Sequence, residues 1–296
     1  MNAPWAPLRE AMRAGAEAGW LPASIGYVFA INALLCALLI GPLLGGLGAL
    51  VVMKRLAFFS QAIGQAALTG VALGVLLGEA GATPYVSLFG FCGLFALALN
   101  YTRQRTRLPS DTVIAVFLSV SLAVGASLLV VLAGKADAHL LDSVLFGSIL
   151  TVNDLDIGVL LVVTLVTLAV AWRYGNQMIL ASFQTDLAHV RGVRVVWLEY
   201  LFLLLVTAVT VASVKIIGAI LVEALLVIPA AAARQFCRSL RGFFLWSGGL
   251  CTASCLVGIY VPMQFDLPIP SGGAIILVAA ILFFGSLLVF RKETTR

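Results

Sequence analysis

The stretch WLEYLFLLLVTAVTVASVKIIGAILVEALLVIPAAAA occupies residues 197–233, and only Glu199, Lys215 and Glu223 in it carry a charge. A helix needs about 20 apolar residues to cross the ~30 Å hydrocarbon core of a bilayer. The stretch is therefore long enough for two membrane spans, which we place at 197–213 and 216–233. The fold of the whole chain follows from this stretch, because similar runs recur on both sides of it.

Apolar runs of the same kind begin near residue 25 and continue almost to the C-terminus. With 62% hydrophobic and 10% charged residues, and a mean hydropathy of +1.11, the chain is far more apolar than soluble domains, which are roughly half apolar and a quarter charged. The alternating pattern of a membrane β-barrel is not seen. We predict an all-α, polytopic membrane helical bundle with about 8–9 transmembrane helices, at 25–52, 57–78, 85–101, 112–133, 156–173, 197–213, 216–233, 243–262 and 273–290.

The bundle is expected to form a single transmembrane domain over residues 25–296. Residues 1–24 carry four charges and no apolar core, so they do not resemble a cleavable signal. A short amphipathic helix on the membrane surface is one interpretation of this segment. Glycines are dense in the first two spans, and small residues let membrane helices approach closely. They predict a tightly packed bundle, and they are Gly41, Gly45, Gly46, Gly48, Gly64, Gly70 and Gly74.

Basic residues set the orientation of the bundle, since short loops rich in Lys and Arg stay in the cytoplasm. With nine spans, every basic cluster falls on one side, and the C-terminus is then cytoplasmic. The net charge of +5 lies in these short clusters rather than on one face, which argues against a nucleic-acid partner. Five cysteines lie in apolar runs without a Cys-x-x-Cys pair, and we interpret them as core residues. The clusters are Lys54-Arg55, Arg103/Arg105/Arg107, Arg173 with Arg191 and Arg194, Arg234/Arg238/Arg241, and Arg291-Lys292.

The opposite side receives the polar segment 135–156, with Asp137, His139 and Asp142 near its middle. Carboxylates beside an imidazole are a weak signal for a site that meets an arriving metal ion. The alternative is that the acidic residues, which include Asp154 and Asp156, keep the ends of two helices hydrated. Both interpretations stay open.

The longest internal interruption, between Arg173 and Trp197, has helical character. Ser182 is suited to cap a helix, Leu187 and Val190 fall three apart on one face, and Gly192 is suited to end it. We predict a short amphipathic helix at about 179–192, on the cytoplasmic side, that docks a soluble partner. A helix that only lies on the lipid surface is the alternative.

This segment resembles the coupling helix of the permease subunits of ATP-binding-cassette (ABC) importers for zinc, manganese and iron. Further stretches are similar to that family in the same order, from about residue 45 to the C-terminus. They are GALVVMKRLAF (48–58), GVALG (70–74), DTVIAV (111–116), LFGSIL (145–150), IGAILVEALLVIPAAAAR (217–234) and DLPIPSGG (266–273). The resemblance implies a homo- or heterodimer of permeases, two cytoplasmic ATPase subunits and an extracytoplasmic metal-binding protein. It also implies that Ser182, Phe183, Asp186, Leu187, Arg191 and Gly192 contact the ATPase.

The second span departs from the family pattern. The family usually has an Asp and, four residues later, a His on one helix face, and here Gln61 and Gln65 stand at those positions, with Thr69 replacing a following proline. An amide oxygen ligates a hard cation but brings neither negative charge nor an imidazole. Gln61 and Gln65 either line the substrate pathway or hold helices together by hydrogen bonds.

Glu223 is a carboxylate deep in an apolar helix, which costs about 2.5–3.5 kcal/mol on insertion scales, so such a group normally faces a cavity or a partner. It is a candidate to supply the negative charge that Gln61 lacks. The alternative is a carboxyl group that is protonated or hydrogen-bonded and only stabilises the bundle. Lys215, eight residues earlier, is near the outer end and does not assure an ion pair.

The sequence has no phosphate-binding Gly-x-x-x-x-Gly-Lys-Ser/Thr pattern, so ATP hydrolysis is expected in a separate partner subunit and this chain is not expected to be an enzyme. The primary hypothesis is a permease subunit of an ABC importer for zinc, manganese or iron, free or chelated, in a bacterial inner membrane. Membrane lipid surrounds such a subunit, and no cofactor is expected in it. The rival hypotheses are an ion-coupled secondary carrier that uses Glu223 and a structural or regulatory membrane subunit.

Overall fold

The computed structural model describes residues 28–78, 84–132, 147, 152–183, 188, 190–265 and 271–293. The described residues form nine helices and no strand. Eight are long and apolar enough to cross a membrane, and the last contains a shorter apolar stretch, Gly272–Leu288. The predicted all-α bundle of about 8–9 membrane helices is confirmed. The helices are α2 (Val28–Met53), α3 (Ala57–Leu76), α4 (Tyr85–Arg105), α5 (Ser110–Leu132), α7 (Asp154–Phe183), α9 (Val195–Ile217), α10 (Ala219–Phe236), α11 (Leu240–Gln264) and α12 (Ser271–Glu293).

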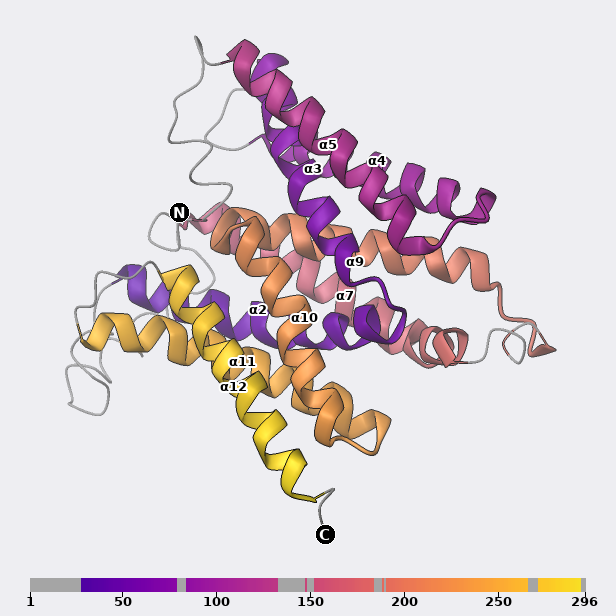
Figure 1. Ribbon diagram of the computed structural model, residues 1–296. Helices are drawn as coiled ribbons and strands as arrows, with labels where there is room; N and C mark the ends of the chain where they lie inside the picture. The colour runs from indigo at the N-terminus through magenta and orange to yellow at the C-terminus, as the bar shows by residue number, and fades with distance from the viewer. Residues whose placement is uncertain are drawn as a thin grey trace.

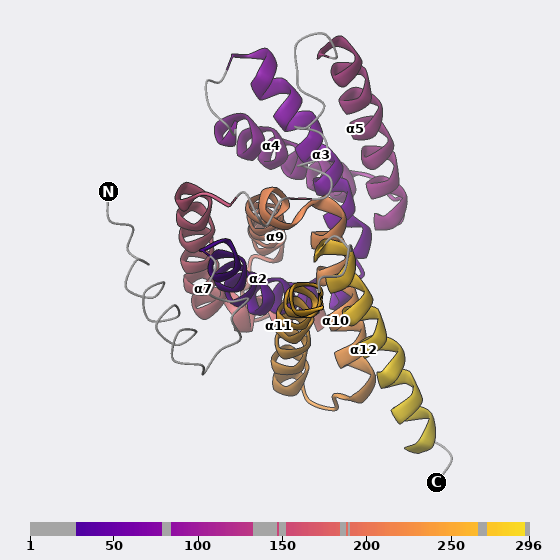
Figure 2. The same cartoon turned by 90° about the vertical axis from the view of Figure 1, so that its left-hand side faces the viewer.

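The helices gather in groups within the bundle (Figure 1). In both views α3, α4 and α5 stand together on one side of the bundle, and α11 and α12 lie on the other (Figure 2). Among the described helices, α2 and α11 form the most extensive contact, and α10 contacts α2, α3, α9, α11 and α12. The large fully buried side chains, such as Phe59, Ile63, Phe202 and Leu203, come mainly from α2, α3 and α9.

Glycines mediate the close helix contacts, as the sequence predicted. A methyl group built on Gly41 or Gly45 of α2 would lie 2.6 Å or less from atoms of Thr252 or Gly248 on α11. One built on Gly48 would overlap the carbonyl oxygen of Leu226 on α10. Because no hydrophobic force brings helices together in lipid, contact at this range is a main source of their association. Gly46 is the exception in α2, since nothing lies within 4 Å of its missing Cβ atom.

Two predicted boundaries were wrong. The span placed at 156–173 continues as α7 to Phe183, so the first residues of the predicted segment 179–192 belong to a membrane helix. The break placed between residues 213 and 216 falls at Gly218, where φ is 87° and ψ is 154°. Only glycine adopts such a backbone conformation without steric cost, so α9 ends and α10 begins at this residue.

The basic clusters gather at one end of the bundle. Arg103 at the end of α4 meets Glu199 near the start of α9, and Lys54 lies over the ring of Phe202 on α9. Phe236, at the end of α10, packs in a cluster that includes Met53. Tyr85, which begins α4, lies at the opposite end together with the start of α7 and the end of α9. The helices therefore cross the bundle in the alternating directions that the basic clusters predicted.

Candidate functional site

The three candidate pathway residues lie on two helices that contact one another. Gln61, Gly64 and Gln65 are spaced i, i+3 and i+4 and share one face of α3. A methyl group built on Gly64 would lie 3.3 Å from the Cβ atom of Ala219 on α10, and Glu223 is one turn further along α10 on that face. The structure therefore places the glutamine face of α3 against the part of α10 that carries Glu223.

Gln61, Gln65 and Glu223 are each half-buried in the single chain. Within the described part of the chain, none of the three makes a side-chain hydrogen bond or an ion pair with another residue. An unpaired amide or carboxyl group is costly in hydrocarbon, and such groups face water-filled cavities or protein partners. Gln61, Gln65 and Glu223 thus form a polar strip along the exposed edge of the α3–α10 contact.

Thr69 replaces the proline that the resemblance leads one to expect in α3, and it has a structural role here. Its side chain is fully buried, and Oγ1 donates a hydrogen bond of 3.1 Å to the carbonyl oxygen of Ser121 on α5. Gly125, one turn after Ser121, leaves room for the contact, because a methyl group there would lie 2.8 Å from the same Oγ1 atom. The hydroxyl group therefore attaches the glutamine helix to α5.

The break between α9 and α10 is covered by a distant segment of the chain. Gly147 has φ of 67°, and a methyl group on it would overlap the backbone of Ile217 and Gly218. Gly147 of LFGSIL thus meets Gly218 of IGAILV, and both stretches carry the family resemblance. This contact fixes where α10 starts, and so fixes the depth of Glu223.

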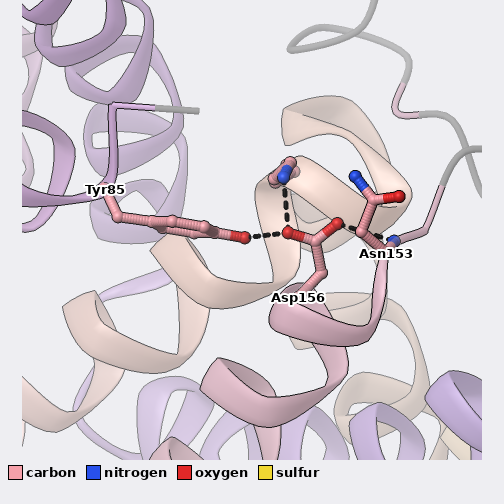
Figure 3. Close-up of polar contacts among 4 residues, drawn as sticks. Tyr85, Asn153 and Asp156 are labelled. Carbon is pink, nitrogen blue, oxygen red and sulfur yellow. Dashed lines mark hydrogen bonds and ion pairs between the residues drawn. The ribbon is translucent and has the colours of Figure 1, made fainter. Parts of the chain in front are cut away.

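A charged cluster around Asp156 (Figure 3) lies where α4 and α7 begin and α9 ends, opposite the basic clusters. Asp156, in the first turn of α7, is 2% exposed. Its Oδ1 atom accepts hydrogen bonds from the Tyr85 hydroxyl and from Nζ of Lys215, and its Oδ2 atom accepts one of 3.0 Å from the backbone N–H of Asn153. Nζ of Lys215 also lies 4.9 Å from the centroid of the Tyr85 ring. One carboxylate thereby joins the ends of α4, α7 and α9.

Sequence reasoning missed this cluster. It placed Asp156 among hydrated loop residues and considered Lys215 only in relation to Glu223, because both lie on one apolar stretch. The structure pairs Lys215 with Asp156 instead, 59 residues away. The available signal was that a lysine within an apolar run needs a carboxylate partner, and that an aspartate begins another predicted span at the same end of the bundle.

A second charged cluster lies at the basic end. Nη2 of Arg103 lies 2.8 Å from Oε2 of Glu199, and Nζ of Lys54 lies 5.4 Å from the centroid of the Phe202 ring. Burial lowers the pKa of Lys54, and Arg103 lowers it further, while Glu199 opposes the shift. The contact between the chain turn after α2 and the start of α9 is therefore electrostatic as well as apolar.

The segment predicted to contact an ATPase is only partly as expected. Ser182 is not a cap: its Oγ atom donates to the carbonyl oxygen of Met178, four residues back within α7. Gly192 does end a helical turn, with φ of 71° and a hydrogen bond of 3.0 Å from the Val193 N–H to the Ala188 carbonyl. That bond is the outer one of a Schellman motif, in which glycine at C′ closes a helix. Arg191 beside it is exposed.

Other predicted residues lie outside the described part of the chain. They are the candidate metal residues Asp137, His139 and Asp142, the candidate ATPase contacts Asp186 and Leu187, the side chain of Phe183, and residues 1–24. In the ranges that are described, no group of three or more His, Cys, Asp or Glu side chains is arranged to hold a metal ion.

Known proteins resemble the chain along nearly its whole length. The ABC 3 transport family matches residues 26–290. The manganese import system permease protein ScaB of Streptococcus gordonii is 31% identical over 265 residues, which are 90% of this chain and 92% of that protein. The high-affinity zinc uptake system membrane protein ZnuB of Haemophilus influenzae is 29% identical and covers 88% of this chain and 97% of its own.

The fold is similar to a solved structure as well. PsaBC from Streptococcus pneumoniae, solved in complex with Fab, superposes with a TM-score of 0.77 at 28% identity and covers 94% of each chain. Sequence and structure agree on the same kind of protein, and the resemblance inferred from the separate stretches is confirmed. The chain belongs to the ABC 3 transport family of membrane permeases.

Proposed function

We propose that the chain is the permease subunit of an ATP-driven ABC importer that carries a divalent metal ion across a bacterial inner membrane. The family supports the transport role, and the names of the relatives point to manganese and zinc as cargo. The observation that carries the proposal furthest is the half-exposed polar strip of Gln61, Gln65 and Glu223 at the contact between α3 and α10. A second permease copy facing this strip encloses a polar path through the bilayer.

The donor atoms of the strip favour manganese over zinc. Two amide groups and a carboxylate offer only oxygen ligands on the path, whereas zinc sites usually include imidazole or thiolate. Glu223 supplies the single negative charge, and Gln61 and Gln65 supply neutral carbonyl oxygens one helical turn apart. A weakly charged site of this kind holds a cation briefly and lets it leave, as a transport path requires.

The partner ATPases act at the basic end of the bundle, which we assign to the cytoplasm together with the C-terminus. The helical turn that closes at Gly192 exposes Arg191 between α7 and α9. Closure of the ATPases on ATP moves this segment, and α7 and α9 transmit the movement to the rest of the bundle. The path then alternates between its two openings, a two-state rearrangement biased by nucleotide.

Metal accumulation in cells tests the transport role. Cells that lack the chain are complemented with wild type, with Glu223→Gln or with Asp111→Asn, an exposed carboxyl group on α5 that serves as the matched control. Manganese and zinc contents are measured by mass spectrometry after a pulse of each metal. We expect manganese uptake to fall at least tenfold in Glu223→Gln and to be unchanged in Asp111→Asn. Unchanged uptake and selectivity in Glu223→Gln would show that this carboxylate does not line the path.

The energy source of uptake distinguishes an ATP-driven importer from an ion-coupled secondary carrier. Depletion of ATP with the proton gradient maintained is expected to stop metal uptake. A protonophore with ATP maintained is expected to leave metal uptake unchanged. The opposite result would favour an ion-driven carrier, for which Glu223 is the candidate coupling site. If deletion of the chain leaves both metals unchanged, a structural or regulatory subunit becomes the better description.

A further inference from the structure

A long apolar groove runs along the outside of the bundle between α2 and α7. It has a volume of about 580 Å³, and most of its lining is apolar, including Leu43 and Leu47 of α2 and Leu168 of α7. Gly46 and Gly175 also line it, and its polar lining residues are Thr164, Thr167 and Asn176. Nothing lies within 4 Å of the missing Cβ atoms of Gly46 and Gly175, so these two glycines leave the floor of the groove open. The α3–α10 polar strip does not contribute to it.

The groove has the length of one membrane leaflet. Its lining runs from Leu38 to Leu50 on α2 and from Thr164 to Ile179 on α7. At a rise of 1.5 Å per residue these segments are about 18 and 22 Å long. Half of a hydrocarbon core is about 15 Å thick, so a lipid acyl chain from one leaflet fills the groove along its axis.

A second cavity continues the groove at the basic end of the bundle. It also has a volume of about 580 Å³, and it shares Asn176 and Ile179 with the groove. Gln177 and Arg191 bring polar and positive character to its wall, and none of the lining residues that the structure describes is acidic. Basic pockets between membrane helices on the cytoplasmic side are suited to anionic lipid head groups.

We propose that the groove between α2 and α7 binds an anionic phospholipid of the cytoplasmic leaflet, with an acyl chain along Gly46 and Gly175 and the head group at Arg191. The apolar length fits the acyl chain, and the positive mouth complements the phosphate. The exposed edge of the groove carries Leu38, Leu168 and Trp172, the last 94% exposed, as expected for a surface that meets lipid. The bound lipid lies between α7, which leads to the Arg191 segment, and α2.

Native mass spectrometry of the purified full-length chain tests the site. Detergent-solubilised protein is titrated with dioleoylphosphatidylglycerol, which is anionic, or with dioleoylphosphatidylcholine, which is zwitterionic. We expect wild type to retain phosphatidylglycerol preferentially, Gly46→Leu and Gly175→Leu to lose the bound lipid, and Arg191→Gln to bind phosphatidylglycerol about fivefold more weakly. Gly285→Leu on α12 is the matched control, since that glycine also has nothing within 4 Å of its missing Cβ atom.

Three results would overturn the proposal. If wild type retains both lipids equally, the site does not select an anionic head group. Equal loss of lipid in Gly285→Leu and Gly175→Leu would indicate general annular lipid rather than a site. A photo-reactive residue at position 172 that cross-links to residues 1–27 or to a second copy, and not to lipid, would give the groove a different occupant.

Discussion

The Asp156–Lys215 pair offers a direct test of how the ends of α4, α7 and α9 opposite the basic clusters are held together. Asp156 is 2% exposed and the Lys215 side chain 22% exposed, so removing either partner leaves a charge with little access to water. Breaking a buried ion pair in this way costs about 3–5 kcal/mol, whereas replacing both partners with apolar or neutral groups is often nearly neutral. Because Lys215 keeps some exposure, we expect about 3 kcal/mol for Asp156→Asn and more for Lys215→Met, which strands the buried carboxylate.

The measurement is a double-mutant cycle on the thermal unfolding of the purified protein, followed by tryptophan fluorescence. A loss of 3 kcal/mol corresponds to about 6 °C in a chain of this size. The variant with both substitutions is expected to unfold at a higher temperature than either single variant, because it buries no unpaired charge. Asp111→Asn is the control, since that carboxyl group is exposed and its substitution is expected to cost less than about 1 kcal/mol.

Two outcomes would refute this reasoning. If the double variant loses as much as the sum of the single variants, Asp156 and Lys215 are not coupled. If Asp156→Asn costs no more than Asp111→Asn, the carboxylate does not hold α4, α7 and α9 together.

Further predictions concern the same cluster and the glycine contacts. Tyr85→Phe removes one donor to Asp156 but leaves Lys215 in place, so we expect a loss of about 1.5–3 kcal/mol, measured by the same unfolding assay; no loss would mean that the hydroxyl group is not needed. Gly48→Ala is expected to cost about 3 kcal/mol, because the new methyl group overlaps a backbone oxygen of α10 that cannot move alone. Gly46→Ala, two residues earlier, meets open space and is expected to be neutral or stabilising by about 0.5–1 kcal/mol; equal effects of the two substitutions would contradict the packing described.

Much of the fold could be predicted because a membrane imposes strong constraints on sequence. Each helix must present about 20 apolar residues, and short basic loops must remain on one side. These two rules give the number and direction of the spans, and the glycines of α2 and α3 indicate close packing. Helix ends were less well predicted. The helix α7 continues past the polar residues 174–177 to Phe183, and Met178 and Ala181 beyond them are buried, which hydropathy alone does not register.

The sequence by itself determined a bundle of membrane helices and its family, since both depend on local composition and on short stretches in a fixed order. It also singled out Gln61, Gln65 and Glu223. Only the tertiary structure decided which of these helices meet, that Gly64 lies against Ala219, and that Lys215 pairs with Asp156 rather than with a group on its own stretch. The physical reason is that an ion pair or a close backbone contact depends on distance in space, and two helices brought together by packing can be far apart along the chain.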